Sequence, residues 1–340
     1  MFRVSGPSPA LNIGSGAASS VSGTTYSQSV PREGTERQDL ERKRNMKFES
    51  KPLDTGVGAE IIGLDLSKPI DEPTQSDLCD IWLDVGILVF RGMGTSSERQ
   101  LALSRCFGVP EIHPVKTVRL EGCPEIVCLS NKGSVEPIVH YVDDEAIAGL
   151  IPWHTDMIYT TRPCRGALLR MVEKPPRGGR TGWIDATAAY EALSEEMKQR
   201  IDGLEARFDF VADICDMRFG RPENLRHGSM GTMEFPNFPP VAHPLVWTHP
   251  VSGRKSLMVG PIHLVEVVGM DRSEGDPLLE ELVAHSTDGR FTYFHDWQVD
   301  DMVLWDNWRT LHMASGIPPE CEREVHRTSM RGDYEMGRVL

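Results

Sequence analysis

From Met46 onward, the chain is a series of short apolar strand patterns separated by turns rich in glycine and proline. Strand patterns cover 58–66, 86–90, 246–248, 257–259, 291–297 and 301–305, and helix patterns cover 75–85, 97–107, 185–193 and 194–201. Asp185 and Ser194 are suited to cap the last two helices. Short strands that frame a few helices favour a mainly β fold, an antiparallel barrel or jelly roll with flanking helices. A doubly wound fold is disfavoured because no glycine-rich phosphate loop joins a strand to a helix.

Charge and composition narrow the class of partner. The 340 residues carry a net charge of −14, which argues against binding to nucleic acid or to an anionic membrane. No apolar run approaches the ~18 residues that a membrane-spanning helix needs. The seven cysteines include no C-x-x-C pair, so we expect free thiols in a reducing cytoplasm. We therefore expect a cytoplasmic protein, a homo-oligomer, whose partner is a small molecule.

Residues 1–45 differ from the rest of the chain. They are rich in serine, glycine and threonine and lack periodic apolar patterning. This composition predicts a disordered extension before a single domain over 46–340. A transit peptide and a translation start at Met46 are both compatible with it.

A histidine and a carboxylate two residues apart, His154 and Asp156, stand in apolar surroundings. On a strand the two side chains would point the same way, and a buried carboxylate needs a cation or hydrogen bonds. His312, which follows another apolar strand, would complete two histidines and one carboxylate. That set leaves three metal positions open in non-heme Fe(II) oxygenases. The count alone also permits zinc in a hydrolase, and His312 alone would suit a structural core histidine.

Two arginines lie beyond His312. Arg323 and Arg327 are four residues apart, so on a strand both would face the same side. One could clamp a dicarboxylate cosubstrate and the other an acidic substrate. With Glu322 and Glu324 nearby, a solvated charged edge strand is the alternative.

Together these stretches resemble the taurine dioxygenase / 2,4-dichlorophenoxyacetate dioxygenase family of Fe(II)- and 2-oxoglutarate-dependent oxygenases. The resemblance covers about Leu53 to Gly332. It is carried, in order, by residues 58–66, 153–156, 178–183, 188–193, 243–246, 248–255, 305–307 and 312–327.

The resemblance implies a fold, a ligand set and a reaction. The fold is a double-stranded β-helix of the jelly-roll type. His154, Asp156 and His312 would hold Fe(II), while Thr181 and Arg323 would bind the distal carboxylate of 2-oxoglutarate. O2 would complete the site, and hydroxylation of a small organic acid would release succinate and CO2, with ascorbate in support. Related halogenases lack the carboxylate ligand, so Asp156 favours hydroxylation.

The resemblance also points to the substrate. Arg327 matches the arginine that grips the acidic group, and His113 matches a histidine that contacts the substrate. Lys116 and Leu150 stand where taurine enzymes have a tyrosine and an asparagine. A leucine cannot accept a hydrogen bond from an ammonium group, which disfavours taurine. We expect a larger, less polar acid: a sulfonate, a sulfate ester, or an aryloxy or alkyl carboxylate.

Two segments have no counterpart in the family pattern. Residues 131–149 could form a lid over the pocket. Residues 218–240 contain Phe235 and Phe238, which could line a hydrophobic pocket or simply pack. A catalytically silent jelly-roll module that binds a small acid or a protein is the alternative function.

Overall fold

The computed structural model describes residues 46–340 except 114–115, 133–136 and 232–235. The predictions for the extension 1–45 and for Phe235 lie outside the described residues. A single domain over 46–340 stays a prediction.

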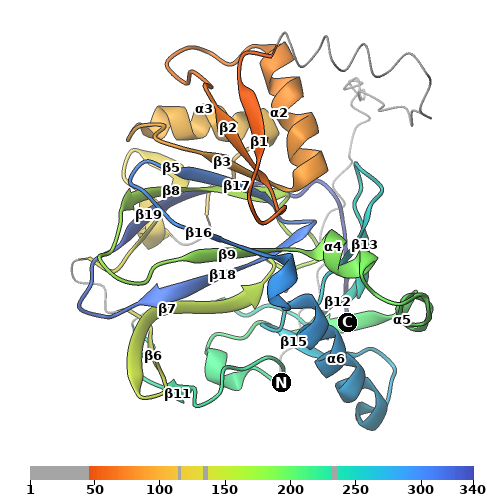
Figure 1. The fold of residues 1–340 in the computed structure, drawn as a ribbon. Coiled ribbons are helices and arrows are strands. Elements are labelled where there is room, and N and C mark those ends of the chain that lie inside the picture. Colours follow the sequence, from red (N-terminus) through yellow and green to blue (C-terminus); the bar gives the residue numbers. More distant parts are fainter. Residues whose placement is uncertain (1–45, 114–115, 133–136, 232–235) are drawn as a thin grey trace, which may run out of the picture.

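Within the described residues, two large β-sheets lie one above the other (Figure 1). The eight-stranded sheet contains, in spatial order, β1 (Glu49–Pro52), β2 (Ala59–Ile62), β3 (Ile87–Phe90), β17 (Met302–Asp306), β8 (Gly166–Glu173), β19 (Glu324–Met330), β5 (Cys123–Ser130) and β4 (Arg119–Leu120). The six-stranded sheet contains β11 (Arg226–His227), β6 (Val139–Val142), β7 (Glu145–His154), β18 (Thr310–Ile317), β9 (Thr181–Asp185) and β16 (Thr292–His295).

Smaller elements surround the two sheets. A four-stranded sheet contains β15 (Leu264–Val267), β10 (Glu205–Phe208), β12 (Val241–Pro244) and β20 (Arg338–Val339), and a hairpin pairs β13 (Val246–Thr248) with β14 (Lys255–Leu257). The helices are α2 (Glu72–Val85), α3 (Ser97–Phe107), α4 (Ala186–Glu191), α5 (Glu195–Ile201) and α6 (Arg272–Ser286). Short 3-10 turns are η1 (Lys116–Val118), η2 (Ile214–Asp216) and η3 (Gly289–Phe291). Among the described residues, every helix is too short or too polar to span a bilayer.

The core between the two large sheets is built from strand residues that alternate inward. Val89, Leu169 and Val325 come from the eight-stranded sheet and pack against Trp183 of β9. The rings of Trp183 and Trp305 lie 5.8 Å apart between centroids. The two sheets are antiparallel except where β2 pairs with β3, and their shared apolar layer forms the expected jelly roll.

Helices α2 and α3 cover the outer face of the eight-stranded sheet (Figure 1). Trp82 and Phe107 meet edge to face, with ring centroids 5.2 Å apart. The predicted caps are confirmed, because Asp185 accepts backbone hydrogen bonds at the start of α4 and Ser194 does so at α5. Local periodicity and capping chemistry were sufficient to locate these helices.

Helix α6 was not predicted from the sequence. It contains Gly275 and Pro277, which predict a break rather than a helix. Its buried residues Leu278, Leu279 and Leu282 join the same apolar core as α4 and β15. Tertiary burial therefore outweighs the local propensity.

The unmatched segment 131–149 contains β6 and the first part of β7. These strands pair from Val139 with Ala148 to Val142 with Glu145. The described part of the segment thus extends the six-stranded sheet. A lid function for it stays a prediction.

Candidate metal centre

Three side chains meet at one end of β7 and β18, and we call them the metal cluster: His154, Asp156 and His312. The Nε2 atom of each histidine lies 3.7 Å from a different carboxylate oxygen of Asp156. The two imidazole centroids are 4.0 Å apart. His312 lies opposite His154 in the β7–β18 register, so both side chains leave the sheet on one face. The three residues predicted as ligands are therefore brought together.

The route by which Asp156 reaches the cluster differs from the prediction. Strand β7 ends at His154, and Asp156 lies in a turn followed by Met157 at φ 61°. Asn307 orients this turn: its Oδ1 accepts from the backbone N–H of Asp156 at 2.9 Å. Its Nδ2 donates to the carbonyls of Asp156 and Cys164, each at 2.9 Å. A distant amide, rather than strand alternation, aims the carboxylate at the histidines.

The protonation of the cluster suits a divalent metal. Nδ1 of His154 lies 2.9 Å from the Pro152 carbonyl, so it carries the proton and leaves the Nε2 lone pair facing Asp156. Burial, and then the neighbouring His154, lower the pKa of His312 well below its ordinary value. Burial opposes ionisation of Asp156, yet Arg327 and the histidines hold its pKa well below the usual range. Two neutral imidazoles and one carboxylate are the forms that bind metal.

Arg327 on β19 lies directly against this carboxylate. Its Nη1 donates to both oxygens of Asp156, at 3.2 and 3.3 Å. The charge of Asp156 raises the pKa of Arg327. Its Nε is buried and has no partner among the described residues. The guanidinium therefore has a donor available for a further anionic group.

Arg323, the residue before β19, is a cation whose charge is not compensated by a paired acid among the described residues. Burial lowers its pKa to about 10, and its Nε has no hydrogen-bond partner in the described chain. It packs against Gly179, because a Cβ there would lie 3.3 Å from Arg323 Cδ. Two residues further on, Thr181 Oγ1 accepts from Trp297 Nε1 at 3.1 Å, which leaves the hydroxyl proton free to donate. A buried cation of this kind fits an anionic ligand.

Four aromatic side chains pack together beside the metal cluster, and we call them the aromatic cluster: Tyr159, Phe210, Phe238 and His263. Tyr159 lies 4.8 Å from Phe210, 4.7 Å from Phe238 and 5.0 Å from His263 between ring centroids. Burial, followed by the nearby His154, lowers the pKa of His263 to about 3. Burial, followed by Asp156, raises the pKa of Tyr159 to about 12. The backbone N–H of Ile262, the residue before His263, donates to the Trp153 carbonyl at 3.4 Å, so the aromatic cluster adjoins the metal cluster.

Sequence reasoning named Phe238 but missed the other three rings. Tyr159 is three residues after Asp156, and that spacing was the one available signal. Phe210 lies in the loop after β10 and His263 in the loop before β15, outside any motif that the sequence analysis recognised.

The other predicted substrate residues are Leu150, His113 and Lys116. Leu150 packs against Ile214 and Ile262, the latter being the neighbour of His263. Lys116 is exposed on η1, and the half-buried His113 precedes that turn. The His113 carbonyl accepts from Arg119 Nε at 2.6 Å. Contacts of His113 and Lys116 with a substrate stay predictions.

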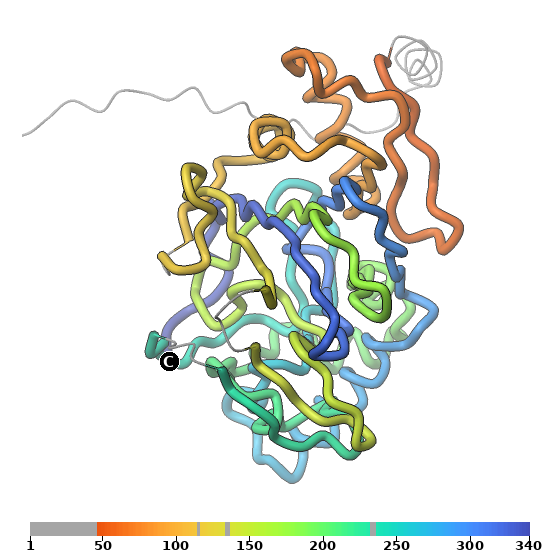
Figure 2. The backbone as a smooth tube through the Cα atoms, turned by 90° about the vertical axis from the view of Figure 1, so that its left-hand side faces the viewer, coloured from red at the N-terminus to blue at the C-terminus, as the bar shows by residue number. Residues whose placement is uncertain are grey.

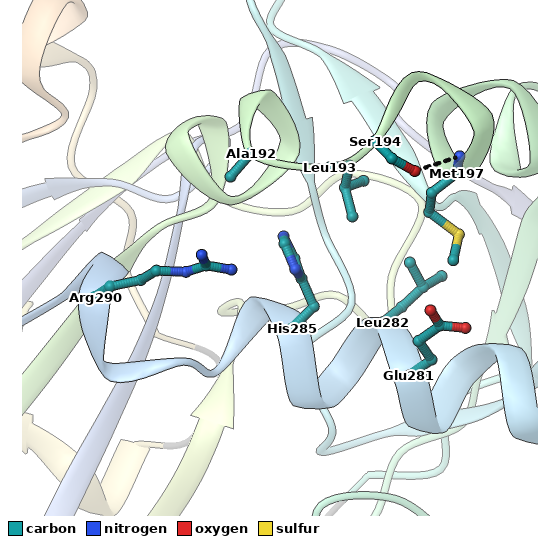
Figure 3. Close-up of a pocket in the computed structure, with 8 residues that line it drawn as sticks. All are labelled: Ala192, Leu193, Ser194, Met197, Glu281, Leu282, His285 and Arg290. Carbon is teal, nitrogen blue, oxygen red and sulfur yellow. Dashed lines mark hydrogen bonds between the residues drawn. The ribbon is translucent and has the colours of Figure 1, made fainter.

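A separate hollow lies between the α4–α5 loop and the end of α6, lined by Leu193, Met197, Leu282 and His285 among others (Figure 3). His285 is held there by a 2.8 Å hydrogen bond from Nε2 to the Ala189 carbonyl. None of its lining residues belongs to the metal cluster. We therefore assign no chemistry to it.

Known proteins resemble this chain over most of its length. The family model described as "Taurine catabolism dioxygenase TauD, TfdA family" matches residues 49–329. The (S)-phenoxypropionate/alpha-ketoglutarate-dioxygenase of Sphingobium herbicidovorans is 31% identical over 288 residues, which are 84% of this chain and 96% of that protein. The alkylsulfatase of Acinetobacter baylyi is 28% identical over 288 residues, 83% of this chain and 84% of that protein.

A solved structure shows the same architecture. The crystal structure of AAD-2 in complex with Mn(II) and N-oxalylglycine has a TM-score of 0.66 and 27% sequence identity. It covers 86% of this chain and 100% of that one. The family match over 49–329 includes the metal cluster, Thr181, Arg323 and Arg327.

Proposed function

The chain belongs to the taurine catabolism dioxygenase TauD, TfdA family of 2-oxoglutarate-dependent dioxygenases, and we propose that its metal cluster serves the hydroxylation of a small organic acid. The observation that carries this proposal is that a candidate metal site and two candidate anion-binding arginines occur together. A two-histidine, one-carboxylate cluster lies beside Arg327, and Arg323 has no paired acid among the described residues. A hydrolytic zinc site would not need a buried arginine without a paired acid.

Each residue of the site has a role in this proposal. His154, Asp156 and His312 would hold Fe(II) and leave room for 2-oxoglutarate and O2. Bound iron and cosubstrate would supply the oxidising chemistry, with release of succinate and CO2. Arg323 and the Thr181 hydroxyl would bind the distal carboxylate of 2-oxoglutarate, because a guanidinium fork and an O–H donor both match a carboxylate.

The substrate would lie between Arg327 and the aromatic cluster. Arg327 would hold its acidic group, since the Nε of this arginine is a buried donor without a partner in the part of the chain that the structure describes. The rings of Tyr159, Phe210 and Phe238 would receive an apolar body. Leu150 adds apolar surface nearby, and His113 and Lys116 would add polar contacts from the η1 region. An aryloxyalkanoate or a sulfate ester fits this combination better than taurine.

Succinate release tests the proposal directly. The purified protein is given 2-oxoglutarate, Fe(II) and ascorbate with a panel of aryloxyalkanoates, alkyl sulfates and alkyl sulfonates. We expect acid-dependent succinate formation, greatest with an aryl or long-alkyl acid, and none from Asp156→Ala protein whose circular dichroism is unchanged. Absence of both turnover and Fe(II) binding would overturn the proposal and favour the silent binding module.

Three further expectations accompany this function. Ascorbate should increase the number of turnovers by keeping iron reduced, which omission of ascorbate from the same assay tests. We also propose a homo-oligomer in the cytoplasm; light scattering after gel filtration tests the former and cell fractionation the latter.

A further inference from the structure

A second group of metal-binding side chains lies on the outer strands of the six-stranded sheet. His140 on β6 and Asp213 and Cys215 around η2 each offer a ligand atom within 4.8 Å of the others. His227 on β11 joins them through Asp213. We call these four residues the His–Asp–Cys cluster. Strands β11 and β6 occupy the edge of the sheet at the lower left of Figure 1, two strands away from β18 and His312.

The two histidines are placed by strand register. Strand β11 pairs with β6 in antiparallel fashion, and His227 is the direct partner of His140. Directly opposed residues leave a sheet on the same face. Figure 2 shows this teal segment alongside the yellow-green β6–β7 hairpin.

Asp213 lies between the two imidazoles. Its Oδ1 is 3.0 Å from His140 Nε2, and its Oδ2 is 2.6 Å from His227 Nδ1. The backbone N–H of Cys215 donates to Oδ1 at 2.9 Å. This turn brings the thiol back toward the carboxylate, so four side chains from three segments converge.

Burial and charge make this convergence unusual for a purely structural contact. His140 is 1% exposed, Asp213 is 8% exposed, and Nδ1 of His140 has no partner among the described residues. The ion-pair partners found for Asp213 in the described chain are histidines, with neither lysine nor arginine among them. Burial opposes ionisation of Asp213, but hydrogen bonds from Cys215 and His140 still lower its pKa. The carboxylate is therefore an anion without a permanent counter-charge.

We infer that the His–Asp–Cys cluster is a structural zinc site, with the two imidazoles, the Asp213 carboxylate and the Cys215 thiolate as ligands. Zinc prefers four such nitrogen, oxygen and sulfur ligands in a tetrahedron, at ~2.0–2.3 Å. The edges of such a tetrahedron are about 3.3–3.8 Å long, so the His140–Asp213 and His227–Asp213 separations of 3.0 and 2.6 Å would lengthen by about 1 Å on zinc binding. On binding, the Cys215 proton leaves to solvent and each imidazole stays neutral with its proton on the other ring nitrogen.

A third group of possible metal ligands in the described chain differs from the His–Asp–Cys cluster, because an arginine already contacts one of its ligand atoms. Cys128, Glu324 and His326 also converge. There, however, Nδ1 of His326 accepts from the buried Arg170 guanidinium at 2.9 Å. A fixed cation at that distance disfavours a second cation. At the His–Asp–Cys cluster, the Arg221 guanidinium donates to the backbone carbonyl of Cys215 at 3.2 Å and not to a candidate ligand atom, which distinguishes the two sites.

Zinc at this position would join the two segments that lack counterparts in the family pattern. His140 belongs to 131–149, and His227 belongs to 218–240. Ile214, which lies between Asp213 and Cys215, packs against Leu150 and Ile262. The metal would hold the η2 turn and strands β6 and β11 in place beside the proposed substrate pocket. The inference concerns structure, and it stands whether or not the proposed function is correct.

The test removes the first metal site before looking for the second. Protein carrying His154→Ala and Asp156→Ala is purified without chelator, and its zinc content is measured by plasma mass spectrometry. We expect one zinc per chain. Adding Cys215→Ser, or His227→Ala at the exposed side of the cluster, should remove most of it. Adding Cys123→Ser, which changes a half-buried free cysteine on β5, should leave the content unchanged.

Two further measurements separate a zinc site from a hydrogen-bonded cluster. Cobalt(II) added to the metal-free protein should give a thiolate-to-cobalt charge-transfer band that Cys215→Ser abolishes. A chelator should lower the melting temperature of the parent protein but not of the Cys215→Ser protein. Substoichiometric zinc that is insensitive to Cys215→Ser, with no cobalt band, would overturn the inference.

Discussion

Two arginines four residues apart illustrate how much the environment decides at the scale of single residues. Arg327 donates to the Asp156 carboxylate at 3.2 Å, whereas Arg323 has a lowered pKa and no paired acid in the described chain. Arg327 is thus anchored beside the metal cluster, whereas Arg323 is available to bind an anion. This difference predicts different kinetic defects.

Arg323→Ala should raise the KM for 2-oxoglutarate, and Arg327→Ala should raise the KM for the organic acid. Loss of a charge-assisted hydrogen bond of ~1.5–3 kcal/mol corresponds to about one to two decades in either case. Steady-state kinetics with each substrate varied in turn provide the measurement. Arg331→Ala is the control, because this exposed arginine pairs with Asp333. Interchanged defects would mean that the two roles are reversed.

Two asparagines allow a second comparison between residues. Asn307 holds the backbone around Asp156, and Asn131 holds the backbone N–H of Arg323 at 2.9 Å. Asn307→Ala should weaken Fe(II) binding about 10- to 100-fold, as loss of groups that orient metal ligands does. Asn131→Ala should instead raise the KM for 2-oxoglutarate and leave Fe(II) affinity near that of the parent. Anaerobic Fe(II) titration distinguishes them, and unchanged Fe(II) affinity in Asn307→Ala would contradict the orienting role.

At the scale of elements, the turn before β9 packs against Arg323, one of the residues proposed to bind 2-oxoglutarate. Gly179 has φ 72°, and a Cβ there would lie 2.6 Å from Pro175 Cγ and 3.3 Å from Arg323 Cδ. Pro175 would have to move, and Arg323 with it. The turn before β9 therefore has no room for a side chain.

Gly179→Ala should destabilise the protein and raise the KM for 2-oxoglutarate together. Gly122 is the matched control, because its φ of 75° imposes similar strain while no atom of the described residues lies within 4 Å of an added Cβ. Gly122→Ala should show only the left-handed strain of about 1–2 kcal/mol in urea unfolding and unaltered kinetics. Equal kinetic effects in the two variants would mean that the turn before β9 has no specific role in binding 2-oxoglutarate.

At the scale of the whole molecule, several buried histidines make stability depend on pH. Burial lowers the pKa of His243, His263, His295, His312 and His326. For His263 the pKa falls from 6.5 to about 3. The folded protein therefore binds this proton less tightly than the unfolded chain. Its contribution to stability is complete above about pH 6.5 and is lost as pH falls toward about 3.

His263→Phe in the metal-free protein should flatten this dependence. Between about pH 7 and about pH 5, the parent should lose about 2 kcal/mol of unfolding free energy through His263 that the variant retains. Urea unfolding at a series of pH values provides the comparison. Parallel curves for the two proteins would show that His263 is protonated equally in the folded and unfolded states.

Local chemistry explains which parts of this protein could be predicted. Helices α2 and α3 and the caps Asp185 and Ser194 depend on periodicity and on hydrogen bonds within a few residues, so they can be recognised in the sequence. Helix α6 could not, because burial of its leucines outweighs Gly275 and Pro277. The candidate metal ligands could also be named from the sequence, since a histidine and a carboxylate in apolar surroundings need a partner, and their ligand role stays a prediction.

Long-range contacts account for the rest. Asp156 points at the histidines because Asn307, distant in sequence, holds its turn. The aromatic cluster joins loops after β7 and β10 and before β12 and β15, and the His–Asp–Cys cluster joins β6, β11 and η2. Such groupings leave no pattern in the chain, because they depend on strand order and loop packing rather than on spacing. The sequence by itself therefore determined which chemical groups this protein has. Only the tertiary structure, through sheet topology and loop packing, decided which of these groups lie close together.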